Sequence, residues 1–249
     1  MASRGCGSHL ADGWRPTLVR VNPSRARAVH AVTAAVVIAA LVLQTVLVVT
    51  GDSVLAETEV PPLLTRLGRL VSYFTIQSNL LVAVTAVQLA RDPLRDGRWW
   101  RPVRAAALVG ITVTGLVHFV LLRPLLDLHG ASWAADKLLH MVVPLLAIIG
   151  WLVAGPRPRA PWRDALTALA WPVAWLAWTL VVGALTGWYP YPFLDVGAKG
   201  AGSVAVTCVA VTVLFLALAA GLSALDRRMP PAPVRRAAAA PSAVATTAE

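Results

Sequence analysis

The chain has 249 residues, of which 57% are hydrophobic and 14% charged, and its mean hydropathy is +0.68. This composition is typical of a membrane protein. The net charge of +10 does not indicate nucleic-acid binding, because the basic residues gather in alternate connections between apolar segments. The two cysteines, Cys6 and Cys208, predict neither a disulfide framework nor a cysteine metal site.

Six apolar segments follow one another, each long enough to cross about 30 Å of hydrocarbon as a helix. The first is too long for a secretory signal and lacks a small-residue cleavage site, so we expect it to remain as an anchor. The predicted fold is all-α, one polytopic membrane bundle of six transmembrane helices (28–225) without a separate soluble domain. A basic tail (1–27) precedes it, and an Ala- and Pro-rich tail (226–249), expected to be disordered, follows it. The predicted helices are 28–50, 70–90, 105–122, 135–154, 162–183 and 201–225.

The 22 Lys and Arg residues are distributed unevenly over the connections. The two tails and the connections 91–104 and 155–163 carry 17 of them, whereas 51–69, 123–137 and 184–200 carry the other 5. This positive-inside pattern predicts that both termini are cytoplasmic. The bias of 20 Arg to 2 Lys, with abundant Ala and Val, indicates a G+C-rich bacterium and hence its plasma membrane.

The second predicted helix carries a polar face near its outer end. Ser72, Thr75 and Asn79 fall at helical spacing on one side, with Gln77 and Ser78 beside them. Because hydroxyl and amide groups facing lipid would lack hydrogen-bond partners, we expect this face to turn into the bundle. The spacing leaves two interpretations open, namely hydrogen bonding between helices and a functional site.

Two histidines are expected at the same depth as Thr75, because His118 lies near the end of the third predicted helix and His140 lies near the start of the fourth. Asp136 precedes His140 by one helical turn, so its carboxylate could accept the imidazole N–H and orient the ring, as in a nucleophile–base relay. Pro144 has no N–H to return to the carbonyl of His140, which leaves that acceptor free.

A zinc site is a further possibility, since His118, His129 and His140 are all potential ligands, although their spacing is too loose to define one. A zinc-dependent hydrolase would require His118 to meet His140 and a carboxylate. The nucleophile–base relay described above would need no metal and no other cofactor. Lys137 is expected to be a solvated charge at the rim of the bundle.

The connection between the last two helices is aromatic. Residues 187–195 read Gly-Trp-Tyr-Pro-Tyr-Pro-Phe-Leu-Asp, and the two alternating prolines favour an extended, stiff turn over a helix. Its aromatic side chains, including that of Tyr191, either anchor the chain at the membrane surface or cover the outer mouth of the bundle.

Three of these stretches carry a resemblance to a known family. Tyr-Phe-Thr at 73–75, His140 followed by Pro144, and Tyr-Pro-Phe-Leu-Asp at 191–195 resemble the androgen-induced-protein family of multispanning membrane proteins, and more closely its actinobacterial relatives. The similarity runs from about residue 70 to the end of the sixth segment. The animal members are membrane hydrolases that cleave fatty acid esters of hydroxy fatty acids with a threonine and a histidine. Asp136 stands where animal relatives carry asparagine, and Met141-Val142, rather than a threonine, follows His140.

The resemblance implies that Thr75 is a nucleophile and His140 its base, with membrane lipids and a lipid ester as partners. A threonine hydroxyl needs such a base, which accepts its proton and later returns it to the departing alcohol. Side-chain donors would stabilise the developing oxyanion. The residues expected to bind the oxyanion or the substrate are Gln77, Ser78, Asn79, His118 and Tyr191.

Three alternatives to this ester hydrolase stay open. The polar layer could be the binding site of a carrier or transporter for small solutes or lipids, although the inner halves of the helices offer few polar groups. It could belong to the zinc-dependent hydrolase described above. In a structural protein it would only hold the helices together. The sequence leaves the oligomeric state and the natural substrate open.

Overall fold

The computed structural model describes residues 22–51, 60–157 and 161–230, and within these ranges the protein is entirely helical, without a strand. Helix accounts for 84% of these residues, which confirms the all-α prediction for the described part of the chain. The helices are α1 (Pro23–Thr50), α2 (Leu63–Ser72), α3 (Phe74–Arg91), α4 (Trp100–Val117), α5 (Gly130–Lys137), α6 (Val143–Ala154), α7 (Trp162–Ala168), α8 (Ala170–Thr186), α9 (Val196–Lys199) and α10 (Ala201–Arg228).

Short π- and 3₁₀-helical turns join several of these helices into longer rods. The π-helical turn η1 (His118–Leu122) and the 3₁₀ turn η2 (Arg123–Leu125) extend α4, and the π-helical turn η3 (Leu138–Val142) joins α5 to α6. A second 3₁₀ turn, η4 (Pro192–Leu194), lies in the aromatic connection. Five rods in the described ranges are long and apolar enough to cross a membrane, and α2 with α3 makes a sixth if the two count as one broken span. The protein is therefore suited to a multi-pass membrane topology.

The second span differs from its prediction as one continuous helix over 70–90. The chain bends by 69° between α2 and α3, and Tyr73, at the bend, has an extended backbone. No proline or glycine stands at the bend, so the sequence carries no local signal for it.

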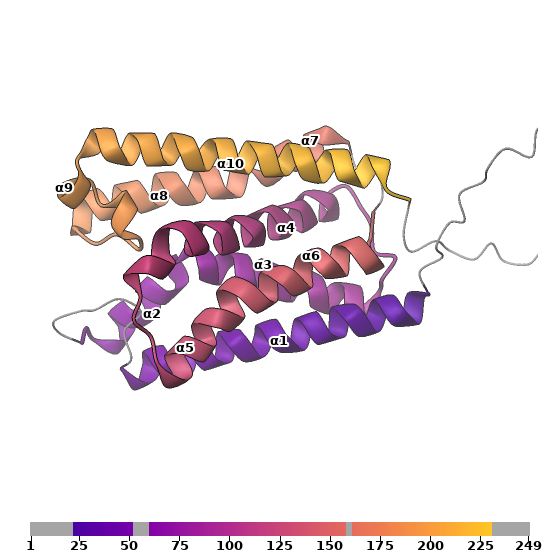
Figure 1. Ribbon diagram of the computed structural model, residues 1–249, viewed down its shortest axis with the longest axis horizontal. Coiled ribbons are helices and arrows are strands. Elements are labelled where there is room, and N and C mark those ends of the chain that lie inside the picture. The colour runs from indigo at the N-terminus through magenta and orange to yellow at the C-terminus, as the bar shows by residue number, and fades with distance from the viewer. Residues whose placement is uncertain (1–21, 52–59, 158–160, 231–249) are drawn as a thin grey trace, which may run out of the picture.

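Figure 1 shows the rods running roughly alongside one another, with α8 and α10 forming a layer on one side of α4. On the other side of α4, α1 packs against α3 and α6, and α4 contacts both of them. A core of Val37, Val82, Ile111 and Val143 fills this region. By contrast, α10 exposes most of its apolar surface, including Val206 and Val209. Apolar side chains exposed along a rod of this length are what a lipid-facing helix requires.

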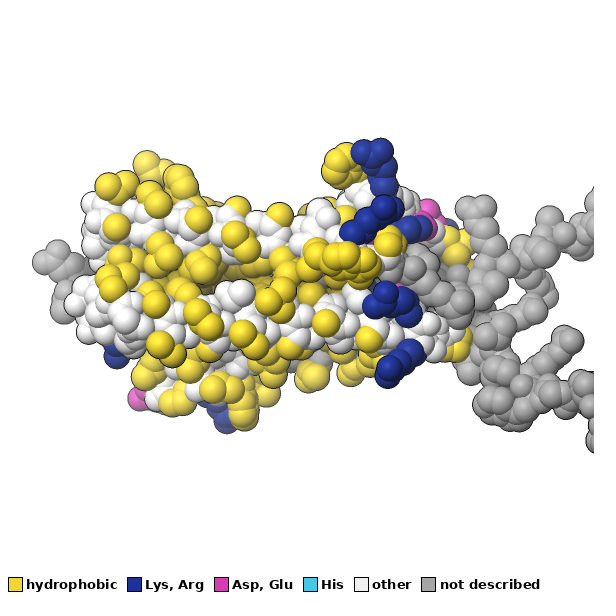
Figure 2. Space-filling model, turned by 90° about the horizontal axis from the view of Figure 1, so that it is seen from above, with side chains coloured by type: hydrophobic (Ala, Val, Ile, Leu, Met, Phe, Trp, Pro, Cys, Tyr) yellow, Lys and Arg dark blue, Asp and Glu magenta, His cyan; other side chains and the backbone are white. Residues whose placement is uncertain are grey.

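The two ends of the described chain lie at the same end of the bundle (Figure 1). Helix α1 begins at Pro23, within the predicted basic tail, and α10 continues to Arg228. The remainder of both predicted tails, with Cys6, lies outside the described residues. Figure 2 shows Lys and Arg side chains gathered around the end of the bundle where α10 finishes.

Candidate active site

Thr75 lies in the first turn of α3, immediately after the bend. Backbone N–H groups in the first turn of a helix have no acceptor within the helix. The N–H of Thr75 instead donates to the hydroxyl of Tyr191, at an N–O distance of 3.2 Å. The bend therefore gives Thr75 a helix-terminal position that a continuous helix would not provide.

Side-chain hydrogen bonds from α3 and α8 stabilise the bend. The indole N–H of Trp175 donates to the carbonyl of Ser72 at 2.9 Å, and the Gln77 amide donates to the carbonyl of Val71 at 3.0 Å. Trp171 in turn donates to Gln77 Oε1. These bonds satisfy carbonyls at the end of α2. Ser72 belongs to α2 and bonds to Gly68, so the predicted polar face shared by Ser72, Thr75 and Asn79 is wrong with respect to Ser72.

The predicted oxyanion donors on α3 have other partners. Ser78 bonds to the Phe74 carbonyl and to the hydroxyl of Thr114 on α4 at 2.7 Å. The Asn79 amide donates to the carbonyls of Thr75 and Leu139 at 2.8 and 3.3 Å. With Gln77 engaged at the bend, the donor groups of all three side chains hold α3 against its neighbours. The structure therefore does not offer them as donors to a substrate.

Thr75, His140 and Asp136 form a hydrogen-bonded chain. Thr75 Oγ1 lies 3.2 Å from His140 Nε2, and His140 Nδ1 lies 3.0 Å from both Asp136 Oδ1 and the Asp136 carbonyl oxygen. Two oxygen acceptors beside Nδ1 favour the tautomer protonated there, which leaves Nε2 to accept from the threonine hydroxyl. Thr75 and Asp136 are buried, and His140 is nearly so.

Both histidines of the site occur in π-helical turns, since η1 begins at His118 and η3 contains His140. Such turns are rare in proteins, and those that do occur are often found at functional sites. In η3 the N–H of Val143 bonds to the Leu138 carbonyl, and Pro144 follows without an N–H of its own. Gly115 lies against this turn, where a Cβ atom would come 3.2 Å from the His140 carbonyl oxygen. A side chain at position 115 would thus press on the backbone that carries His140.

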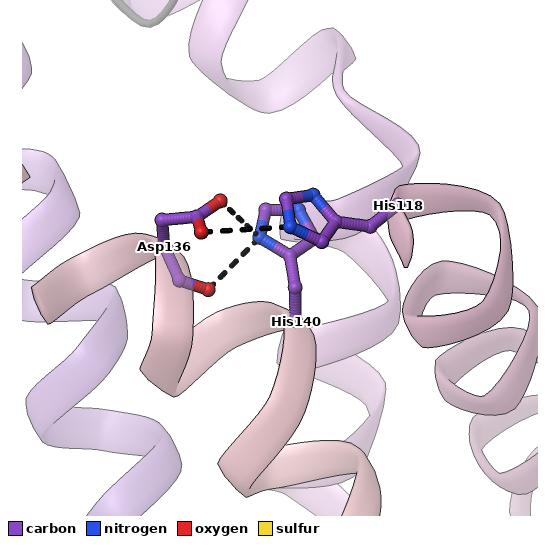
Figure 3. Close-up of side chains that lie close together, drawn as sticks. All are labelled: His118, Asp136 and His140. Atoms are coloured by element: carbon purple, nitrogen blue, oxygen red, sulfur yellow. Dashed lines mark hydrogen bonds and ion pairs between the residues drawn. The ribbon is translucent and has the colours of Figure 1, made fainter. Parts of the chain in front are cut away.

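His118 lies close to His140 and Asp136, the imidazole and carboxylate that a zinc site would require. Its ring stacks on that of His140, and its Nε2 lies 3.5 Å from Asp136 Oδ2 (Figure 3). Neither ring nitrogen of His118 makes a hydrogen bond within the described part of the chain, although the side chain is only 2% exposed. Ligand atoms of the three residues lie within 4.8 Å of one another, so the donor set fits a zinc ion.

Two other residues qualify the zinc hypothesis. His129, the third histidine considered as a ligand, is 84% exposed and pairs with Asp127 outside this cluster. The Lys137 ammonium contacts Asp136 Oδ2 at 2.8 Å, so the expectation of a solvated rim charge at Lys137 is wrong. Asp136 is a buried carboxylate, and pairing with a cation offsets the cost of burying its charge. The same ammonium would repel a metal ion at this carboxylate.

Tyr191 is buried within the aromatic connection, and its hydroxyl lies 3.3 Å from Thr75 Oγ1. The ring makes edge contacts with Tyr73 and Trp175 and stacks on Phe193. Burial raises the pKa of the Tyr191 phenol, so the hydroxyl is protonated at neutral pH and is able to donate. The aromatic side chains of this connection are expected from the sequence either to anchor the chain at the membrane surface or to cover the outer mouth of the bundle. The burial of Tyr191 agrees with the second arrangement.

Two cavities meet at Thr75. The larger, of about 180 Å³, lies among α4, α8, α10 and the aromatic connection, and the smaller, of about 70 Å³, lies among α1, η1, α5 and η3. Thr75, Leu122 and Tyr191 line both cavities, whereas His140 and Asp136 line only the smaller. Thr75 therefore borders both cavities.

No protein-family model, curated protein or solved structure matches this chain. The function proposed for the site therefore depends on its geometry and on the sequence motifs that converge there.

Proposed function

We propose that this protein is an integral membrane hydrolase that cleaves a lipid ester, of the type formed by a fatty acid and a hydroxy fatty acid. Thr75 is the nucleophile, His140 the general base and Asp136 the group that orients the imidazole. The observation that carries the proposal is the chain of contacts from Thr75 Oγ1 to His140 Nε2 at 3.2 Å and from His140 Nδ1 to Asp136 at 3.0 Å.

The chemistry proceeds in two steps. The Thr75 hydroxyl attacks the ester carbonyl carbon as its proton passes to His140 Nε2, and the tetrahedral intermediate collapses to an acyl-threonine. His140 returns the proton to the departing alcohol oxygen. Water then gives a proton to the same nitrogen and attacks the acyl-threonine, which releases the fatty acid and restores the hydroxyl.

The oxyanion formed in each step needs donors near Thr75. The Tyr191 hydroxyl is suitable, since it lies next to the nucleophilic oxygen and is held there by the Thr75 backbone N–H, which donates to it. It is fixed before substrate arrives, which is what makes such a donor effective. In this proposal Tyr191 stabilises the oxyanion. From the sequence, Gln77, Ser78, Asn79 and His118 are expected beside Tyr191 to bind the oxyanion or the substrate.

The site lies beneath the extracytoplasmic surface in this proposal, with both termini in the cytoplasm of a bacterial cell. Support comes from the unequal charge of the connections and from the basic side chains at the end of the bundle opposite the connection between α8 and α9 (Figures 1 and 2). The motifs that resemble the androgen-induced-protein family converge on one point, because His140 and Tyr191 both contact Thr75. This convergence supports our proposal that the protein is a relative of that family.

Activity-based labelling tests this proposal. Purified protein in detergent is treated with a fluorophosphonate probe, and the modified residue is mapped by mass spectrometry while hydrolysis of a long-chain ester is measured. We expect the label on Thr75 and loss of both label and hydrolysis in Thr75→Ala. Full hydrolysis by Thr75→Ala would refute the nucleophile assignment.

A metal-dependent hydrolase is the second candidate, because His118, Asp136 and His140 converge with the donor atoms that zinc prefers. A zinc ion there would polarise the substrate carbonyl or activate a water molecule. An ion bound through either ring nitrogen of His140 would leave Nε2 unable to accept a proton from Thr75, because that nitrogen would hold either the ion or the remaining ring proton. The two candidates are therefore mutually exclusive, and activity that survives a strong chelator would favour the threonine mechanism.

A further inference from the structure

We infer that the two cavities divide the substrate at its ester bond, with the acyl chain in the larger cavity and the alcohol part in the smaller. This inference depends on the proposed function. Its structural basis is that Thr75, Leu122 and Tyr191 line both cavities, so that a molecule extending from one cavity into the other would run beside Thr75.

The position of His140 sets the orientation. This residue must return a proton to the alcohol oxygen when the carbon–oxygen bond breaks, so the alcohol has to leave on the side of Nε2. His140 and Asp136 line the smaller cavity and not the larger. The alcohol part therefore lies in the smaller cavity, and the acyl carbon, bonded to Thr75 in the intermediate, carries its chain into the larger one.

The lining of each cavity agrees with this division. The larger cavity is almost entirely apolar, as a fatty acyl chain requires. The smaller includes the polar side chains of Gln44, Ser132 and His118, which suit an alcohol part bearing further polar groups. The lining of the larger cavity includes Val173 of α8 and Val211, Phe215 and Leu216 of α10.

The larger cavity also opens toward the surface that would face lipid. Val173 on α8 and Leu216 on α10 line it and are 65% and 46% exposed. Figure 2, which views the molecule from the α10 side, shows hydrophobic side chains along a furrow on this face. An acyl chain could thus pass from the bilayer between α8 and α10 to Thr75 without crossing water. The side chains of these two helices would then select the length of the acyl chain.

Narrowing the larger cavity tests this selection. Val211→Trp adds bulk to its lining, and Val213→Trp makes the same change at a 58% exposed position of α10 outside the lining. Rates are compared for p-nitrophenyl acetate and p-nitrophenyl decanoate, which share one alcohol. We expect Val211→Trp to lower kcat/KM for the decanoate by about tenfold or more while the acetate changes little, since even a few misplaced methylenes cost this much. Val213→Trp should affect neither ester. An equal fall for both esters, or no fall, overturns the inference and leaves the threonine mechanism intact.

A labelling experiment needs no turnover and separates this inference from the proposed function. Thr75→Ala protein is photolysed with a p-nitrophenyl ester whose acyl chain ends in a diazirine, and the adducts are mapped. We expect labels on the α10 residues Val211 and Phe215. Labels on the smaller-cavity residues Gln44 and Leu128, or only on outward-facing residues such as Val213, would overturn the orientation. Labels at Val211 and Phe215 in a wild-type protein that hydrolyses no ester would support the acyl cavity and refute the proposed hydrolase.

Discussion

The imidazole of His118 stacks on that of His140, with ring centroids 3.9 Å apart and planes 14° apart. Both rings direct a nitrogen toward the carboxylate of Asp136 (Figure 3). Two stacked rings at this distance would repel each other if both were protonated. In the threonine mechanism the stacked ring of His118 would hold the plane of the His140 ring, whereas in a metal mechanism His118 would be a ligand.

The first prediction concerns Thr75. Thr75→Ala should lower kcat for ester hydrolysis by at least about a thousandfold, because the nucleophile is lost and only binding and oxyanion stabilisation persist. Thr75→Ser should retain measurable activity. Thr112→Ala is the matched control, since among the described residues the Thr112 hydroxyl bonds only to the Leu108 carbonyl of its own helix. A similar loss in Thr112→Ala would show that the effect arises from destabilisation.

The second prediction separates the roles of His118. In His118→Phe an aromatic ring is kept beside His140 and both nitrogens are removed, so the threonine mechanism predicts a fall in kcat/KM of about tenfold, as for a residue that orients another. A metal mechanism predicts near-complete loss, with metal content falling in parallel. Activity and bound zinc, measured on the same purified samples, decide between them.

The third prediction addresses the oxyanion donor. Tyr191→Phe removes the hydroxyl and keeps the ring that packs in the aromatic connection. We expect kcat to fall by about 10²–10³-fold with little change in KM, as for loss of a donor that acts mainly in the transition state. Tyr189→Phe provides a control from the same connection. A change confined to KM would mean that Tyr191 binds substrate and does not stabilise the oxyanion.

A fourth prediction follows from the raised pKa of Tyr191. Burial favours the neutral phenol in the folded protein, so the stability that this group contributes is complete below its ordinary pKa of about 10 and is lost as the pH rises further. Absorbance titration of tyrosinate should show a component that ionises above pH 10. That component should be missing from Tyr191→Phe, and its persistence there would assign it to another tyrosine.

The sequence predicts that Thr75 and His140 lie close together, but it does not predict the local backbone geometry around them. Charge bias and helix length suffice to place Thr75 and His140 at one depth, because these properties depend on lipid thickness and topology and not on packing. The sequence does not predict the bend at Tyr73, since the indole of Trp175 that bonds to the Ser72 carbonyl lies about a hundred positions away, on α8. The pairing of Lys137 with Asp136 was also missed, because adjacent residues on a regular helix do not normally face each other.

The last prediction tests whether this distant support positions the nucleophile. Trp175→Phe removes the indole N–H that bonds to the Ser72 carbonyl while an aromatic ring remains against Phe74. Hydrogen bonds between membrane helices are typically worth about 1 kcal/mol, so the thermal stability in detergent should fall modestly. Trp178→Phe on the same helix is the control, because Trp178 is 64% exposed. If the bend positions Thr75, kcat in Trp175→Phe should fall by more than this loss of stability explains, since small misplacements of a nucleophile are costly. Unchanged kcat in a destabilised Trp175→Phe protein would show that the bend supports folding alone.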